Sequence, residues 1–261
     1  MSFSEVMKEE SNMSNHHVVF GSTVRSIDSY IPNLIQHIER CGNKFASWKL
    51  VVYENDSTDR TRQILLDEKN RLLDQGDKIE CIFEDNVSEP SRTKRLAHGR
   101  NMILDKIRAM SGPIDYVIML DGDNINMSGT FVQTIESCFQ NPTESWDVMA
   151  GNQANSHYYD IWALRYDPII KSDCWADGGH FDINSVYFDK NLPPFEVDSA
   201  FSGIAIYKWS IMSQCQYDGE YHSDNPFGYP TGREKCEHVA LHECIKKKGG
   251  TIWINPAFST N

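Results

Sequence analysis

The sequence predicts an α/β fold, in which a mostly parallel sheet is covered by helices on both faces. In the first half of the chain, short apolar runs rich in β-branched residues alternate with segments whose apolar residues recur at helical spacing. Polar clusters end three of these runs, and ligands of such sheets bind beyond the carboxyl ends of the strands. These clusters are Thr23–Arg25, Glu54–Ser57 and Asp121–Asp123. No repeat and no linker interrupts the 261 residues, which predicts a single domain.

Each element follows from its local pattern. Residues 1–17 are polar and predict a flexible N-terminal tail, so the folded domain is expected to comprise residues 18–261. Periodicity fades between Ser156 and Asp198, a stretch too long for a plain connection, which predicts a functional excursion. The strands are expected at residues 18–24, 49–54, 78–84, 115–120, 200–209 and 251–255, and the helices at residues 30–38, 91–110, 237–248 and from the turn 55–59 to Leu73.

Charge excludes one class of partner. The chain has 25 Lys and Arg against 37 Asp and Glu, a net charge of −12, whereas a nucleic-acid binder neutralises phosphates with a basic face. This balance still allows a small phosphorylated ligand that is held by a few arginines and a metal ion. No apolar run approaches the ~20 residues of a membrane helix, and no charged-then-apolar leader opens the chain. We therefore expect no transmembrane segment and a cytoplasmic location (host cytoplasm for a viral protein).

The seven cysteines form no Cys-x-x-Cys pair. Their odd number and their spacing predict reduced, buried thiols in a cytoplasmic protein. Zinc is not expected, because the nearest group of suitable ligands has no second cluster to complete it. This group is Cys236, His238, His242 and Cys244.

Asp121-Gly122-Asp123 is the candidate metal site. Two carboxylates one residue apart follow the buried strand that ends at Leu120, and both can reach one hard cation. Mg²⁺ or Mn²⁺ takes such oxygens and keeps open positions for phosphate. By itself the triplet is also an ordinary turn. The preceding strand and the other motifs favour the metal interpretation.

Two further clusters carry polar groups suited to a nucleotide. Glu54, Asn55 and Asp56 offer carboxylate and amide edges to a nucleobase and ribose; the alternative is that this turn only caps the next helix. In the third helix, Arg100 and Asn101 enter an apolar segment, where an arginine needs an anionic partner such as a diphosphate. The alternative for Arg92, Lys94 and Arg95 is a solvated basic helix face, although Arg95 could add positive charge to the same site.

The order of four motifs, "VRS…YIP", "VVYENDSTDRT", "RLAHGRNMIL" and "DYVIMLDGDN", resembles nucleotide-sugar-dependent glycosyltransferases of the GT-A fold. More narrowly, it is similar to fungal Golgi α-mannosyltransferases, capsule-associated mannosyltransferases and related bacterial and large-virus enzymes. The resemblance is densest in residues 18–123 and resumes in residues 147–165 and 198–256. It implies a Rossmann-like, mixed and mostly parallel sheet, with a nucleotide-binding half (18–123) and an acceptor-binding half (124–261). It also implies a metal on Asp121 and Asp123, and donor contacts by Thr23, Val24, Arg25 and Gly122.

The resemblance suggests roles for residues in the second half as well. The "YYD…R" segment implies sugar or acceptor contacts by Tyr159, Asp160 and Arg165; the alternative is a core of aromatic residues with a salt bridge. Gly203 could permit close approach of a ligand. Asp198 is either a cap or an active-site carboxylate.

Glu237 opens the last long helix. An acid there is a favourable partner of the helix dipole, and in inverting GT-A enzymes it acts as the base. Related enzymes often take a third metal ligand from a histidine after the last strand. No histidine follows Pro256 here, and His238 or His242 could substitute, although both are expected on the helix surface.

Together these features predict a metal-dependent glycosyltransferase that uses Mn²⁺ or Mg²⁺. It would move a sugar from a UDP- or GDP-sugar to an oligosaccharide or other glycan acceptor. One alternative is a sugar-phosphate nucleotidyltransferase, which needs a glycine-rich, basic first loop; residues 21–25 have one glycine and no following lysine. The other is a non-catalytic nucleotide- or carbohydrate-binding module of the same fold.

Overall fold

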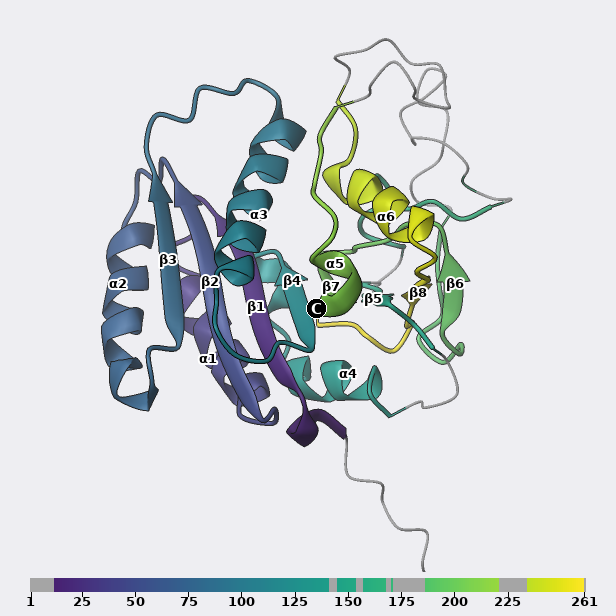
Figure 1. Cartoon of the computed structure of the whole chain (residues 1–261), viewed down its shortest axis with the longest axis horizontal. Helices are drawn as coiled ribbons and strands as arrows, with labels where there is room; N and C mark the ends of the chain where they lie inside the picture. Colours follow the sequence, from purple (N-terminus) through teal and green to yellow (C-terminus); the bar gives the residue numbers. More distant parts are fainter. Residues whose placement is uncertain are drawn as a thin grey trace, which may run out of the picture.

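The computed structural model describes residues 12–140, 145–153, 157–167, 170, 186–220 and 234–260. Its described strands form one eight-stranded sheet in the order β3-β2-β1-β4-β7-β5-β8-β6 (Figure 1). The strands are β1 (His17–Val24), β2 (Ser47–Asn55), β3 (Ile79–Glu84), β4 (Tyr116–Leu120), β5 (Val148–Ala150), β6 (Phe195–Val197), β7 (Ile204–Lys208) and β8 (Ile252–Ile254).

The sheet is mixed and mostly parallel, as predicted. Strands β3, β2, β1 and β4 run parallel to one another. Strand β7 lies antiparallel between β4 and β5, β8 is parallel to β5, and β6 is an antiparallel edge strand. Because β7 runs against β4, the start of β7 and the end of β4 meet at one edge of the sheet, where Leu120 pairs with Ile204.

Helices cover both faces of the sheet. Alternate residues of β1 divide the core in two: Val19 packs with α3 and α6, whereas Val18 and Phe20 pack with α1, α2 and α4. All three residues are at most 3% exposed, so the sheet is buried on both sides. The helices are α1 (Ile31–Gly42), α2 (Thr61–Arg71), α3 (Arg92–Arg108), α4 (Phe131–Ser137), α5 (Trp209–Met212) and α6 (Glu237–Lys247), with short 3-10 helices at Asn12–Asn15, Leu73–Gln75 and Asn124–Asn126.

The predicted tail is too long. Residues 12–15 form a 3-10 helix, Met13 is completely buried in the core, and β1 begins at His17. The backbone N–H of His17 donates to Asp115 Oδ2 at 2.8 Å, which ties the start of β1 to the start of β4. The folded domain therefore includes residues 12–17, because one apolar side chain in a polar stretch is enough to anchor it. Residues 1–11 lie outside the described residues.

The expectation of reduced thiols is wrong for one pair of cysteines. Cys215, after α5, and Cys244, in α6, form a disulfide bond across 29 residues of sequence. Cys41, Cys81, Cys138 and Cys236 are free thiols, and Cys174 lies outside the described residues. The spacing of the cysteines along the chain does not reveal this pairing. Because two of the cysteines form a disulfide, the expectation of reduced thiols no longer supports a cytoplasmic location.

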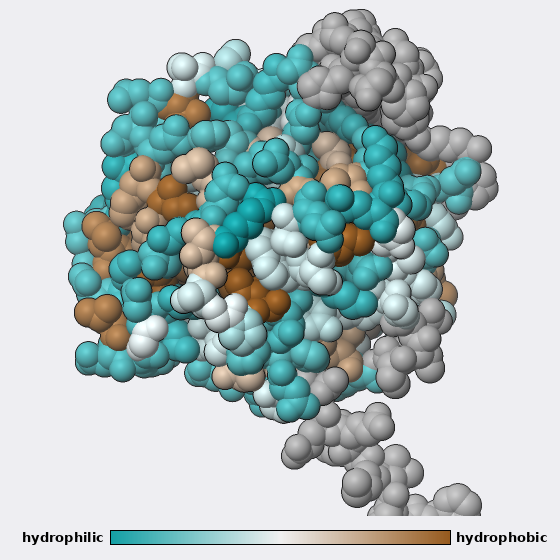
Figure 2. All heavy atoms as spheres, viewed as in Figure 1, coloured by the Kyte–Doolittle hydropathy of each residue, from teal (hydrophilic) through white to brown (hydrophobic). Residues whose placement is uncertain are grey.

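The described surface is largely hydrophilic on the face seen in Figure 2, and its apolar side chains form small separate groups. The larger exposed apolar residues include Leu66 and Leu73 beside α2. Among the described residues, no helix has the length and apolar character needed to cross a membrane.

Candidate active site

A cleft of about 600 Å³ lies at the carboxyl ends of β1, β2 and β4. The rule for parallel sheets places ligands at this edge. Its lining comes from loops of both halves of the chain: Thr23, Val24, Arg25, Ile27, Tyr53, Asn55, Arg92, Arg95, Leu96, Arg100, Asp121, Gly122, Asp123, Tyr159, Asp160, Ile161, Trp162, Phe201, Cys236, Glu237 and His238. A smaller cavity of about 340 Å³ lies at the opposite edge of the sheet and contains none of these residues.

The Asp121–Asp123 loop is held in place by a buried polar network. The backbone N–H of Asp121 donates to the carbonyl of Gly203 at 2.9 Å. The side-chain amide of Asn126, which is completely buried, donates to the carbonyls of Asp121 and Gly203 at 2.8 and 3.0 Å. A satisfied buried network of this kind fixes a single loop conformation. The two carboxylates therefore leave the sheet edge in a defined direction.

Gly122 is required because the loop passes close to β1. A Cβ atom at this position would lie 2.7 Å from Val24 Cγ1 and 3.1 Å from Ser22 Oγ, too close for any side chain. This close approach brings the carboxylates of Asp121 and Asp123 beside the end of β1. The end of β1 supplies Thr23 to the same cleft, and the loop after β1 supplies Arg25.

Arg100 lies between two carboxylates at the base of the cleft. Its Nη2 donates to Asp121 Oδ1 at 3.1 Å, and its Nη1 donates to Glu237 Oε1. The Arg100 and Glu237 side chains are only 3% and 4% exposed. Burial opposes the charge of Arg100, but Glu237 and Asp121 outweigh this and raise its pKa above the ordinary value. In this structure protein carboxylates accept from both terminal nitrogens of Arg100, and the contact of Arg100 with a diphosphate stays a prediction.

The two aspartates of the loop fit a divalent cation that is shared with a ligand. Arg100 occupies Oδ1 of Asp121, and the N–H of Ile125 donates to Oδ1 of Asp123 at 3.2 Å. Within the described residues, Oδ2 of each aspartate accepts no hydrogen bond and is free to bind a metal. No group of three His, Cys, Asp or Glu residues surrounds one point in the described part of the chain.

Burial perturbs the acids and the histidine of the cleft. It raises the pKa of Asp121 to about 7, an effect that Arg100 reduces and Asp123 increases. Burial, and then the charge of Glu237, raises the pKa of Asp160 to about 6. Burial lowers the pKa of His238 well below its usual value, and Arg100 and His242 lower it further. Such perturbed groups in one cleft are typical of functional sites.

The structure brings most of the predicted metal, donor, acceptor and catalytic residues together. Twelve of them line the cleft: Thr23, Val24, Arg25, Asn55, Arg95, Arg100, Asp121, Gly122, Asp123, Tyr159, Asp160 and Glu237. Among these, Arg95 Nη1 also donates to the carbonyls of Glu89 and Pro90, which fixes the start of α3. The cleft therefore joins the two halves of the chain around the Asp121–Asp123 loop.

Three predicted donor residues have structural partners instead. Glu54 is completely buried, accepts from the N–H of Ser57 at 2.8 Å and from Arg62 Nε at 2.6 Å, and does not line the cleft. Asp56, at φ 49°, accepts from the backbone N–H of Asn86 at 2.7 Å and of Val87 at 3.1 Å. Each carboxylate holds a loop, Glu54 the turn after β2 and Asp56 the segment after β3, and neither of them caps α2.

Asn101 is the third predicted donor residue with a structural partner, because it exchanges two hydrogen bonds of 2.9 Å with the backbone of Tyr217. It lies in α3 next to Arg100 but does not line the cleft. Its side chain therefore links α3 to the segment after α5, because consecutive residues of a helix point in different directions.

In the second half, three predicted site residues also lie off the cleft. Arg165 is buried and donates to the carbonyls of Trp162 and Leu164. Asp198 is half-exposed and pairs with Lys246 at the far end of α6. Gly203 has φ +82°, and a Cβ there would lie 2.9 Å from the Ile125 side chain. Gly203 does not line the cleft, and its carbonyl accepts from the N–H of Asp121, so it packs against the Asp121–Asp123 loop.

Sequence reasoning missed several residues that shape the site. Trp162 and Phe201 supply apolar walls. Arg92, for which the sequence left open a solvated helix face, lines the cleft at the start of α3. His238 is 2% exposed, where a surface position was expected, and its ring stacks on Phe201 with 3.6 Å between centroids. Sequence reasoning did not assign Asn126 to the site. Its position five residues after Asp121 was the one signal that could have pointed to its contact with this loop.

Comparison with solved structures identifies the fold. A structure of S. aureus TarS 1-349 in complex with UDP-GlcNAc has a TM-score of 0.51 at 15% sequence identity, covering 92% of this chain and 55% of that chain. Two structures are less similar. GalNAc-T7 with UDP, GalNAc and Mn²⁺ has a TM-score of 0.49 at 14% identity, covering 94% of this chain and 43% of that chain. Mannosyltransferase PcManGT from Pyrobaculum calidifontis in complex with GDP-Man and Mn²⁺ has a TM-score of 0.45 at 14% identity, covering 81% of this chain and 50% of that chain. This chain thus spans about half the length of these proteins.

No protein-family model and no curated protein matches the sequence. The sheet order and the likeness to the TarS structure together show the GT-A fold, a Rossmann-like arrangement. The narrower similarity to fungal mannosyltransferases stays a prediction.

Proposed function

We propose that the protein is a metal-dependent glycosyltransferase that moves a sugar from a UDP- or GDP-sugar to a glycan acceptor. One observation carries the proposal: the carboxylates of Asp121 and Asp123 share a single cleft with the buried acid Glu237. The other wall of this cleft comes from Thr23, Arg25 and Asn55 at the ends of β1 and β2. The TarS structure supports the donor class, because it contains UDP-GlcNAc.

In this proposal Asp121 and Asp123 hold Mn²⁺ or Mg²⁺, and the cation, when bound, neutralises charge on the departing nucleoside diphosphate. Asn55 and the Thr23–Arg25 loop hold the nucleotide. Tyr159 and Trp162 offer aromatic faces to a sugar ring on the other side of the cleft. These placements divide the cleft into a donor end and an acceptor end.

Glu237 is the acceptor-side acid. In an inverting reaction its carboxylate accepts the proton of the acceptor hydroxyl while that oxygen bonds to the anomeric carbon. At the same time the bond from this carbon to the diphosphate oxygen breaks. Glu237 lies in the first turn of α6, and its carboxylate pairs with Arg100.

The proposal is tested by incubating the protein with Mn²⁺, a panel of UDP- and GDP-sugars and a set of glycan acceptors, and measuring which products are released. A glycosyltransferase releases the nucleoside diphosphate and glycosylates an acceptor. A sugar-phosphate nucleotidyltransferase releases pyrophosphate from a nucleoside triphosphate, and a binding module releases neither. Release of pyrophosphate, or binding without turnover, would select one of the two alternatives.

The catalytic assignment is tested by a pair of variants. We expect Glu237→Gln to lower transfer by roughly 10²–10⁴, with donor binding nearly unchanged, because the amide cannot accept the proton. Asp198→Asn is the matched control: it removes an acid of the same half of the chain that faces Lys246 outside the cleft. A normal rate in Glu237→Gln together with an inactive Asp198→Asn would transfer the role to Asp198. The anomer of the product, measured by NMR, decides between inversion and retention.

A further inference from the structure

Arg100 is the most constrained charged group of the cleft. Its two terminal nitrogens donate to acids from different elements, Asp121 after β4 and Glu237 at the start of α6. Its guanidinium carbon lies 5.4 Å from the ring centroid of Phe201 and 5.8 Å from that of Tyr217. The guanidinium plane is thus fixed by two ion pairs and two aromatic rings.

The same contacts leave Arg100 little capacity to bind a phosphate. A diphosphate is recognised through terminal guanidinium nitrogens. Here both already donate to carboxylates, one from Glu237, which is buried, and one from Asp121, whose side chain is 31% exposed. Its positive charge is also balanced by two negative charges. Arg92 differs: it lines the same cleft from the same helix, is exposed, and its guanidinium has no partner among the described residues.

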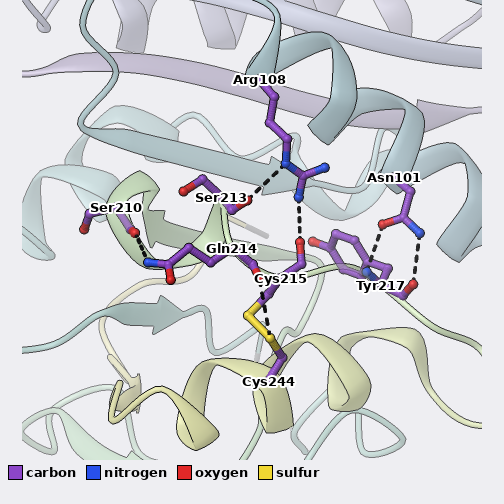
Figure 3. The surroundings of a disulfide bond; sticks show 8 residues. All are labelled: Asn101, Arg108, Ser210, Ser213, Gln214, Cys215, Tyr217 and Cys244. Atoms are coloured by element: carbon purple, nitrogen blue, oxygen red, sulfur yellow. Dashed lines mark hydrogen bonds between the residues drawn. A yellow bond between two sulfur atoms is a disulfide. The ribbon is translucent and has the colours of Figure 1, made fainter.

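The aromatic wall at Tyr217 is itself anchored from both sides, as Figure 3 shows. Asn101 of α3 exchanges two hydrogen bonds with the Tyr217 backbone, and Arg108 of α3 donates to the carbonyl of Cys215 at 2.7 Å. The disulfide joins Cys215 to Cys244 of α6. The segment beside Arg100 therefore ties the helix that carries Arg100 to the helix that carries Glu237.

We propose that Arg100 is a positioning residue: its guanidinium fixes Glu237 relative to Asp121 and does not bind the donor diphosphate. The metal carboxylate and the acceptor-side acid then keep a constant separation, and a donor held by the metal meets Glu237 in a fixed geometry. Small displacements between a reacting group and its base lower rates strongly, so this constraint acts on the chemical step. The inference rests on the proposed function.

The test is Arg100→Lys, alone and combined with Glu237→Gln. A lysine keeps the charge, which limits the loss of stability, but a single ammonium cannot bridge two carboxylates as the planar fork does. We expect kcat to fall about 100-fold, while the Kd of the nucleoside diphosphate with Mn²⁺, measured by calorimetry, changes less than about threefold. In the Glu237→Gln background the same substitution costs less than about threefold in kcat, because residues that act through one another are not additive. Circular dichroism and thermal melting confirm that the variants are folded.

Arg92→Lys is the matched control, since Arg92 contacts neither acid. Any loss of kcat that Arg92→Lys causes is expected to be the same in the wild-type background and in the Glu237→Gln background. Two results overturn the inference: a Kd weakened tenfold or more by Arg100→Lys, or an equal loss of kcat in both backgrounds. An active wild type with such results refutes this inference alone. A wild type that neither binds nucleoside diphosphates with Mn²⁺ nor transfers sugar refutes the proposed function, and the inference with it.

Discussion

His242, on α6 behind Glu237, makes the stability of the fold depend on pH in a predictable direction. Its side chain is completely buried, and it shares hydrogen bonds with Ser199 Oγ at 2.8 Å and the Tyr207 hydroxyl at 3.1 Å. Burial lowers its pKa from 6.5 to about 3. At every pH above about 3 the imidazole is therefore neutral in the folded protein, while the unfolded chain binds a proton below about 6.5.

The sign follows from linkage. Because the unfolded state binds more protons, the contribution of His242 to stability is fully present above pH 6.5 and is lost as the pH falls toward 3. From about pH 7.5 to about pH 5.5 the loss amounts to about 1 kcal/mol for this one group. The raised pKa values of Asp121 and Asp160 act in the opposite sense, since their folded forms gain protons over the same range. The pH dependence of wild-type stability therefore does not show the contribution of His242 separately.

A variant isolates it. In His242→Gln the titrating group is gone, while the amide can still donate and accept one hydrogen bond each. The destabilisation caused by this substitution, measured by urea unfolding, should shrink by about 1 kcal/mol when the pH drops from about 7.5 to about 5.5. Ser199→Ala is the control, because it removes a hydrogen bond to the imidazole but no titrating group, so its penalty should not change with pH. A pH-independent penalty in His242→Gln would refute the assignment of a buried neutral histidine.

Asn55→Ala and Glu54→Gln should separate binding from stability. Asn55 lines the cleft, so Asn55→Ala should weaken nucleoside diphosphate binding by about 0.5–1.5 kcal/mol in calorimetry, with little change in melting temperature. Glu54→Gln removes a buried charge that pairs with Arg62, so it should destabilise the fold by about 1–3 kcal/mol. The reverse pattern would restore Glu54 as a nucleotide ligand. Cys244→Ser should lower the free energy of unfolding by about 2–4 kcal/mol under oxidising conditions and change nothing after reduction with dithiothreitol. Equal stability of variant and wild type in both conditions would show that Cys215 and Cys244 are not bonded.

The first half of the fold could be predicted because its strands are long apolar runs. Strand β2 has nine residues and β4 is a buried run, and both fall within a few residues of their predicted positions. The second half has strands of three residues, such as β5 and β6, which are too short to show any periodicity. The antiparallel placement of β7 between β4 and β5 depends on long-range pairing that no local pattern records.

The same distinction applies to the site. Asp121 and Asp123 were found because their chemistry and their position after a strand are both local. The partners of Arg100 could not be found, since Glu237 lies 137 residues away in sequence. Glu54 shows the opposite difficulty: a carboxylate that holds a loop and one that binds a nucleotide have the same local sequence, and only its complete burial separates them.

The most direct test of the central claim is the affinity of a nucleoside diphosphate, UDP or GDP, measured by calorimetry with Mn²⁺ and with EDTA. Because Asp121 and Asp123 leave oxygens free for a shared cation, we expect Mn²⁺ to strengthen binding at least about tenfold in the wild type and not in Asp123→Asn. Asp115→Asn, at the opposite end of the same strand and outside the cleft, should keep the full metal effect. Equal affinity with Mn²⁺ and with EDTA in the wild type, or an undiminished metal effect in Asp123→Asn, would contradict the metal-dependent donor site.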